Sequence, residues 1–163
     1  LRVTPTAPDF VYYYVKIKNK FVIADGFITL EFTESFAYEN YDFISNIVAK
    51  LHENGFLCSI DDFGTGYSSY NILKTIDMDE IKLDKFFLSK GVDENRDRTL
   101  LKSIIEMLKE LGMKVTQEGV ETKEDLYRLE KLGCDVIQGF YFSKPLKYVD
   151  YVAFIEENFI KQN

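Results

Sequence analysis

Cysteine and histidine are scarce in this sequence of 163 residues, which contains two cysteines and one histidine. Cys58 and Cys134 lie in separate strand-like apolar stretches, so the sequence predicts two buried, reduced thiols and excludes a disulfide scaffold. The one histidine, His52, follows a helical pattern and precedes Gly55, which predicts a solvated helix end. With so few nitrogen and sulfur ligands, a metal site would be built from oxygen atoms, as Mg²⁺ and Mn²⁺ prefer.

Long apolar runs and an excess of positive charge are also absent. No stretch approaches the ~20 apolar residues that span a bilayer, and residues 1–10 lack the basic start and apolar stretch of a signal peptide. We therefore expect a soluble, cytoplasmic chain without direct membrane insertion. The formal net charge of -7 disfavours binding of a DNA or RNA polymer, although metal ions could still hold a phosphate ligand.

Linkers and repeats are missing as well, and the composition is that of a folded domain. Only three prolines occur, no Gly/Ser/Pro-rich or repeated segment interrupts the chain, and 46% of the residues are hydrophobic. These features predict one globular domain over residues 1–163 with a substantial hydrophobic core.

Short strand-like runs alternate with helical runs from residue 27 onward. Apolar residues at helical spacing predict helices over residues 41–52, 68–73, 96–111, 123–132 and 150–160. The strand-like runs cover residues 28–32, 56–60, 78–83, 113–116 and 135–138. Such alternation implies parallel strands with right-handed crossovers, as in a doubly wound sheet or a (β/α)8 barrel.

Charged or amide residues stand at the carboxyl end of strand after strand, and this feature distinguishes the two folds. The residues are Glu31, Asp61, Asp62, Lys82, Glu118 and Gln138. Polar groups that converge from many strand ends are typical of the top face of a barrel, whereas a doubly wound sheet gathers its ligands at one switch point. The sequence therefore predicts an α/β fold of the TIM-type (β/α)8 barrel, with about six of the eight β-α units present.

The adjacent carboxylates Asp61 and Asp62 are the most informative pair, because they would repel each other unless a cation binds them. A simple turn is the alternative for this pair, and a helix cap or strand-to-helix turn is the alternative for Glu31 and Glu118. Lys82 lies within a strand, where nearby carboxylates would keep it charged; the alternative is an edge lysine that reaches solvent. The recurrence of such groups on successive strands favours one shared site.

Five segments, in order, resemble the signature segments of the EAL-domain cyclic di-GMP phosphodiesterases. They are LEFTES (30–35), DDFGTGYSS (61–69), IKLDKFF (81–87), QEGVET (117–122) and QGFYFSKP (138–145). Five ordered segments are much more specific than a lone glycine motif. The resemblance implies a bacterial signalling enzyme that hydrolyses cyclic di-GMP to linear pGpG with two metal ions, Mg²⁺ or Mn²⁺.

The resemblance also implies roles for individual residues. The metal ligands would be Glu31, Asp61, Asp62 and Glu118. Glu118 would also be a general base, and Lys82 would orient or polarise the attacking water. Gln138 would help to line the substrate site. Glu34 would anchor the loop after Asp61 and Asp62, and Glu121 would support the neighbouring loop.

Two features of the family pattern are not found in the 163 residues. The tripeptide Glu-Ala-Leu, whose glutamate is a ligand of the first metal, does not occur, and Arg2 stands where the family has a metal-binding asparagine. A full barrel takes about 250 residues. We therefore expect this chain to be part of a longer protein, or its barrel wall to be completed by another chain.

Two classes of function stay open on the sequence alone. One is a phosphodiesterase, and the other is a catalytically inactive EAL domain that acts as a cyclic di-GMP receptor or protein-interaction module. The retained metal-directed residues favour the enzyme, whereas Arg2 favours the receptor. Members of the family that the chain resembles commonly form homodimers and are often fused to sensory or GGDEF domains, so both are possibilities for this chain.

Overall fold

The structure, a computed structural model, describes residues 9–65, 70–89 and 91–160. Arg2 and residues 66–69, for which the sequence made predictions, lie outside these described residues.

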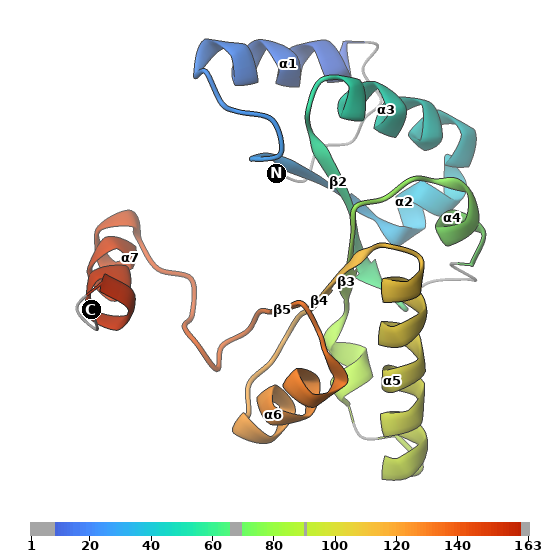
Figure 1. The fold of residues 1–163 in the computed structure, drawn as a ribbon, viewed down its shortest axis with the longest axis vertical. Coiled ribbons are helices and arrows are strands. Elements are labelled where there is room, and N and C mark those ends of the chain that lie inside the picture. The colour runs from blue at the N-terminus through green and yellow to red at the C-terminus, as the bar shows by residue number, and fades with distance from the viewer. Residues whose placement is uncertain (1–8, 66–69, 90, 161–163) are drawn as a thin grey trace.

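A single parallel sheet forms the centre of the described chain (Figure 1). Its strands are β1 Thr29–Thr33, β2 Leu57–Phe63, β3 Glu80–Leu83, β4 Lys114–Gln117 and β5 Val136–Ile137. Each strand pairs in parallel with the next strand along the chain, so the order is β1-β2-β3-β4-β5. The order never reverses, which leaves no switch point of the kind found in a doubly wound sheet. The predicted barrel type of α/β fold is confirmed.

Helices connect the strands. They are α1 Phe10–Lys20, α2 Glu34–Glu39, α3 Tyr41–Glu53, α4 Tyr70–Thr75, α5 Glu94–Glu110, α6 Lys123–Leu132 and α7 Tyr148–Ile155. A 3-10 turn, Lys85–Leu88, follows β3, and a π-helical turn, Glu156–Ile160, follows α7. The described residues thus contain five β-α units, where the sequence analysis expected about six. They are preceded by α1, and neither α1 nor α2 was predicted.

The two faces of the sheet differ in character because side chains alternate along each strand. Leu30, Ile60, Ile81 and Val115 are buried in the hydrophobic core. The helices contribute to that core Ile44, Ile47, Val48, Leu51, Leu101, Ile105, Leu108 and Leu129. The alternate strand positions are polar, and they include Glu31, Ser59, Glu80, Lys82 and Thr116. The apolar face therefore fixes the helices, and the polar face is free to form a site.

Helix α3 shows how the local sequence produces this arrangement. Its apolar residues recur at helical spacing, and the chain turns into β2 at Gly55, whose φ of +74° is accessible to glycine at little cost. His52 lies in the last turn of α3, as expected, but its ring is only partly solvated. The ring is half-buried and its Nε2 lies 2.9 Å from Asp79 Oδ2, because the loop before β3 packs beside the end of α3.

Both cysteines are free, as predicted, although they differ in burial. Cys58 is fully buried on β2, whereas Cys134, just before β5, is half-buried. Burial raises the pKa of the Cys58 thiol to about 12, with further contributions from Asp79 and Asp77. The thiol is therefore protonated at neutral pH.

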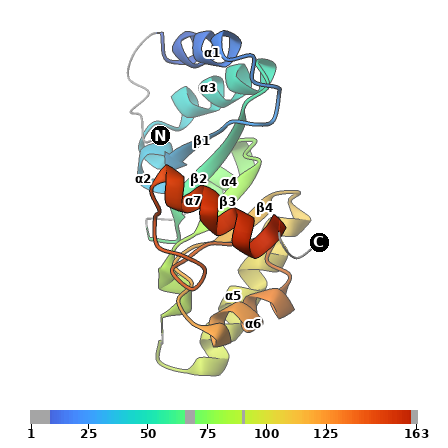
Figure 2. The same ribbon diagram turned by 90° about the vertical axis from the view of Figure 1, so that its left-hand side faces the viewer.

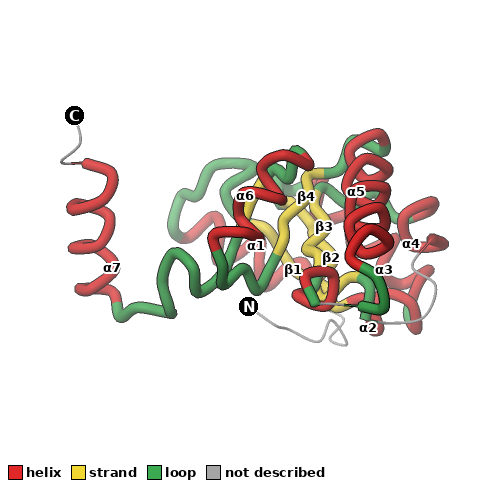
Figure 3. Tube along the Cα trace, turned by 90° about the horizontal axis from the view of Figure 1, so that it is seen from below, coloured by secondary structure: helices red, strands yellow, loops and turns green. Residues whose placement is uncertain are grey.

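The sheet is open within the described residues, since β1 and β5 each pair with one neighbour. Helix α7 stands apart from the other helices in Figures 1 and 3, and Figure 2 shows it in front of the strands, on the side away from α5. Tyr148 and Val149 of α7 are largely exposed. Within residues 9–65, 70–89 and 91–160, no helix has the length and apolar character needed to cross a membrane.

Candidate metal and catalytic site

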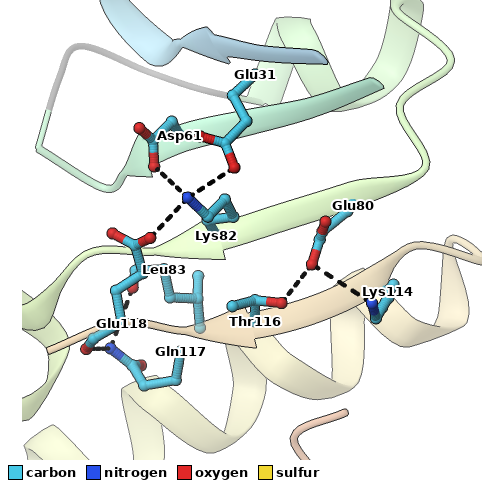
Figure 4. A network of polar contacts seen from close by, with 9 residues as sticks. All are labelled: Glu31, Asp61, Glu80, Lys82, Leu83, Lys114, Thr116, Gln117 and Glu118. Carbon is cyan, nitrogen blue, oxygen red and sulfur yellow. Dashed lines mark hydrogen bonds and ion pairs between the residues drawn. The ribbon is translucent and has the colours of Figure 1, made fainter. Parts of the chain in front are cut away.

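Charged side chains from four neighbouring strands meet at one end of the sheet (Figure 4). Glu31 lies on β1, Asp61 on β2 and Lys82 on β3, and Glu118 directly follows β4. The carboxyl ends of parallel strands share one edge, so Glu31 and Glu118, which are far apart in the sequence, both contact Lys82 there. The predicted convergence of these residues is thus what the geometry shows.

Lys82 is at the centre of this cluster. Its Nζ lies 2.7 Å from Glu118 Oε1, 3.0 Å from Glu31 Oε1 and 3.1 Å from Asp61 Oδ1. The Lys82 side chain is only 9% exposed. Three carboxylates from three other strands or strand ends therefore surround one buried ammonium group, so Lys82 is not an edge lysine that reaches solvent.

The protonation state of Lys82 follows from its surroundings. Burial by itself lowers the pKa of a lysine, but the hydrogen bonds with Glu118, Glu31 and Asp61 outweigh burial and hold the pKa of Lys82 above its ordinary value. The side chain is a permanent cation at neutral pH, and it acts as a hydrogen-bond donor in the site.

Asp62 adds a fourth carboxylate next to this group. Each of the residues Asp61, Asp62 and Glu118 has one carboxylate oxygen that lies within 4.8 Å of the other two. Asp62 has a φ of +57°, a left-handed conformation that is uncommon for residues other than glycine and often found at functional sites. This conformation allows two consecutive residues of one strand to belong to the same cluster.

The donor set of the cluster fits divalent cations. It consists of carboxylate oxygens, which are the ligands that Mg²⁺ and Mn²⁺ prefer. The four carboxylates of Glu31, Asp61, Asp62 and Glu118 outnumber the single ammonium of Lys82, so the site carries an excess of formal negative charge. Bound cations would balance that excess.

The loop after β2 is fastened by Glu34, a residue of α2 that is 1% exposed. Its Oε2 accepts a hydrogen bond of 2.9 Å from the backbone N–H of Gly64. Gly64 has a φ of +97°, and a Cβ atom there would lie 2.3 Å from the ring of Phe87. The chain can therefore pass between Glu34 and Phe87 only with glycine at this position.

Replacing Glu34 with alanine is expected to destabilise the protein by about 1–3 kcal/mol, because a carboxylate acceptor is removed from a buried site. The Glu34→Gln variant keeps an acceptor oxygen, so it should lose clearly less stability than Glu34→Ala. Urea unfolding measures the free energy, and amide hydrogen exchange at Gly64 should speed up in Glu34→Ala. Unchanged exchange at Gly64 would show that Glu34 does not hold this loop.

Gln117 is a residue of the site that the sequence analysis did not assign. Its side chain is fully buried, and the carbonyl oxygens of Leu83, Asp84 and Glu118 share the two N–H donors of Nε2 at distances of 2.9 to 3.1 Å. These bonds join the ends of β3 and β4, which carry Lys82 and Glu118 (Figure 4). Its place in the QEGVET segment, directly before Glu118, was the only sequence signal.

Two predicted residues lie at the edge of the site. Gln138 directly follows β5, and its side chain is exposed. Its backbone N–H donates a 2.9 Å hydrogen bond to the carbonyl of Gln117, and its own carbonyl accepts a 3.1 Å hydrogen bond from the N–H of Val120. Glu121 is exposed in the loop after β4. Neither residue is part of the ion-pair cluster around Lys82, and their roles stay predictions.

Comparison with known families decides what this arrangement belongs to. The family model of the EAL domain matches residues 7–145 of this chain. The chain belongs to the EAL-domain family. The match includes every strand of the sheet and all the carboxylates around Lys82.

Individual EAL-domain proteins are similar to the chain in sequence or structure. The cyclic di-GMP phosphodiesterase NbdA of Pseudomonas aeruginosa is 40% identical over 124 residues, which are 76% of this chain and 16% of NbdA. The crystal structure of the EAL domain of Mycobacterium smegmatis DcpA has a TM-score of 0.85 and 30% identity, covering 93% of this chain and 68% of that one. The manganese and cyclic di-GMP complex of Klebsiella pneumoniae BlrP1 has a TM-score of 0.79 and 28% identity, covering 86% and 36%.

Proposed function

We propose that this EAL domain is a metal-dependent phosphodiesterase that hydrolyses cyclic di-GMP to linear pGpG. The observation that carries the proposal is the cluster in which carboxylates from successive strand ends surround Lys82. The name of NbdA and the ligands of the BlrP1 complex support the substrate and the use of a divalent cation. The chain spans only 16% of the length of NbdA, so the activity and substrate of that whole protein are proposals for this chain.

The carboxylates Glu31, Asp61, Asp62 and Glu118 would hold two cations, Mg²⁺ or Mn²⁺. When bound, such cations lower the pKa of a water molecule and neutralise charge on the phosphate. They also allow an acidic chain to bind an anionic dinucleotide.

The chain's own groups would bind the substrate and move the proton. Glu118 lies at the cluster, directly after β4, and as a carboxylate it can accept a proton from the attacking water. Lys82 has the three donor hydrogens of an ammonium group, so it can exchange one carboxylate partner for the water or a phosphate oxygen. Gln138, beside the end of β4, would hydrogen-bond the bound dinucleotide with its exposed amide.

The decisive assay measures conversion of cyclic di-GMP by the longest natural protein that contains these residues. Product pGpG is separated from substrate by chromatography after incubation with Mg²⁺ or Mn²⁺, and a chelator-treated sample is the control. Metal-dependent formation of pGpG is the expected result. Tight binding of cyclic di-GMP without turnover, measured by calorimetry, would contradict the proposal and favour the receptor function. A homodimer, a cytoplasmic location and fusion to other domains stay predictions.

A further inference from the structure

A second group of metal-binding side-chain types lies at the opposite end of the strands. His52 is in the last turn of α3, Cys58 is the second residue of β2, and Asp79 directly precedes β3. The carboxylate cluster is built at the carboxyl ends of the strands, whereas these residues lie where β2 and β3 begin. The two groups are therefore separated by the length of the sheet.

The three side chains are already close to one another. An imidazole nitrogen, a thiol sulfur and a carboxylate oxygen, one from each residue, lie within 4.8 Å of one another. Asp79 Oδ2 is 2.9 Å from His52 Nε2 and accepts a 2.7 Å hydrogen bond from the backbone N–H of Cys58. These contacts hold Asp79 in place, so a cation would meet an ordered set of donors.

The burial of the group suits an ion that enters from solvent. Cys58 is fully buried, while the side chains of His52 and Asp79 are 26% and 34% exposed. The thiol therefore forms the floor of the group, and the imidazole and carboxylate form its accessible side. A water molecule can complete the coordination from that side.

Asp77 adds a negative charge on the other side of the His52 ring. Its Oδ2 lies 3.9 Å from Nδ1 of His52, on the ring nitrogen opposite the one that faces Asp79. At this distance Asp77, whose side chain is 98% exposed, makes no hydrogen bond with the ring and would act on a cation only through its charge.

We infer that His52, Cys58 and Asp79 form a binding site for a divalent transition-metal cation of the Zn²⁺ type. A mixed set of sulfur, nitrogen and oxygen donors suits Zn²⁺, whereas Mg²⁺ prefers oxygen alone. Binding replaces the proton on Cys58 Sγ, which is released to solvent. The bound ion links the end of α3 to the beginnings of β2 and β3, and it acts independently of the proposed hydrolysis.

Cobalt absorption tests this site directly, because a cysteine thiolate bound to Co²⁺ produces a charge-transfer band in the near ultraviolet. The longest natural protein that contains these residues is treated with a chelator, desalted and titrated with Co²⁺. We expect a band that saturates at one equivalent per chain and disappears when Zn²⁺ is added. Absence of the band from the unsubstituted protein at saturating Co²⁺ would overturn the inference.

Four variants assign the band to this group. Cys58→Ser should abolish it, whereas the matched control Cys134→Ser should retain it, as should Asp61→Asn in the carboxylate cluster. His52→Gln changes a half-exposed ring and should weaken Co²⁺ binding at least about tenfold without loss of the fold, which circular dichroism checks. A band that persists in Cys58→Ser, or full affinity in His52→Gln, would contradict the site.

Discussion

Asp61→Asn is expected to reduce hydrolysis of cyclic di-GMP by more than about 100-fold, since losing even the partners that orient metal ligands costs 10- to 100-fold. Asparagine has the size of aspartate but no charge. Asp61 is 8% exposed, and it contacts Lys82 and shares the oxygen cluster with Asp62 and Glu118. The substitution removes one anionic ligand and one partner of Lys82 without opening a cavity. Initial rates of pGpG formation at saturating Mg²⁺ or Mn²⁺ measure the effect.

Glu80→Gln is the matched control for Asp61→Asn. Glu80 is a carboxylate on the same face of the sheet, one alternate position before Lys82 on β3, but its contacts are with Thr116 and Lys114 (Figure 4). The Glu80→Gln variant should keep most of the turnover. Near-normal turnover by Asp61→Asn, or an equal loss in Glu80→Gln, would show that the carboxylates around Lys82 are not the metal site.

Lys82→Met is expected to lower the stability of the metal-free protein by about 2 kcal/mol. Removing one partner of a buried ion pair typically costs about 3–5 kcal/mol, and solvent reduces the cost here because the Glu31 side chain is 36% exposed. The variant leaves Glu31, Asp61 and Glu118 without their shared cation. Added Mg²⁺ or Mn²⁺ should therefore stabilise Lys82→Met more than the unsubstituted protein, because the metal ion then supplies the missing positive charge. Chemical denaturation with and without metal measures both effects.

Lys114→Met is the control for the loss of a lysine from the same face of the sheet. Lys114 Nζ lies 3.7 Å from Glu80 and its side chain is 52% exposed, so the free energy of unfolding should change by no more than about 0.5 kcal/mol.

The pH dependence of stability tests the charge of Lys82. The pKa of Lys82 is raised on folding, so its contribution to stability is fully present below the ordinary value of 10.5 and is lost as pH rises through the folded value. The difference in the free energy of unfolding between Lys82→Met and the unsubstituted protein should therefore be constant across neutral pH. A difference that vanished near pH 7 would contradict a permanently charged Lys82.

The carboxylate cluster could be predicted because it depends on a rule of chain topology. Parallel strands end at a common edge, so Glu31, Asp61 and Glu118 could be brought together from the alternation of strands and helices alone. The exact partners could not be predicted in this way. That Lys82 contacts all three carboxylates depends on the register between β2, β3 and β4.

Helix α1 could not be predicted because its local sequence favours another structure. The segment FVYYYVKIKNK is rich in aromatic and β-branched residues, which are typical of strands. In the structure, Phe10, Tyr14 and Lys18 lie on one buried face, and Lys18 Nζ donates to Asn54 O at 2.6 Å and contacts Asp25. Contacts with residues more than 30 positions away therefore outweigh local propensity.

The surroundings of His52 were likewise decided by residues far along the chain. A histidine before a glycine at the end of a helix has a solvated position as its ordinary outcome, whereas the His52 side chain is only 26% exposed and pairs with Asp79. Asp79, which pairs with the ring, lies 27 positions further on, and no spacing pattern links it with Cys58. The proximity arises because α3, β2 and β3 pack at the same end of the sheet.

The sequence by itself determined the family, the order of the strands and the residues from which the carboxylate site is built. Periodic apolar residues and ordered motifs can be recognised within short stretches of the chain, so they require no knowledge of tertiary contacts. Tertiary structure alone decided how those residues pair. Lys82 became a shared partner of three carboxylates, Gln117 joined two strand ends, and His52 met Cys58 and Asp79. Each of these contacts depends on strand register and helix packing, which are set by burial of the whole apolar face of the sheet.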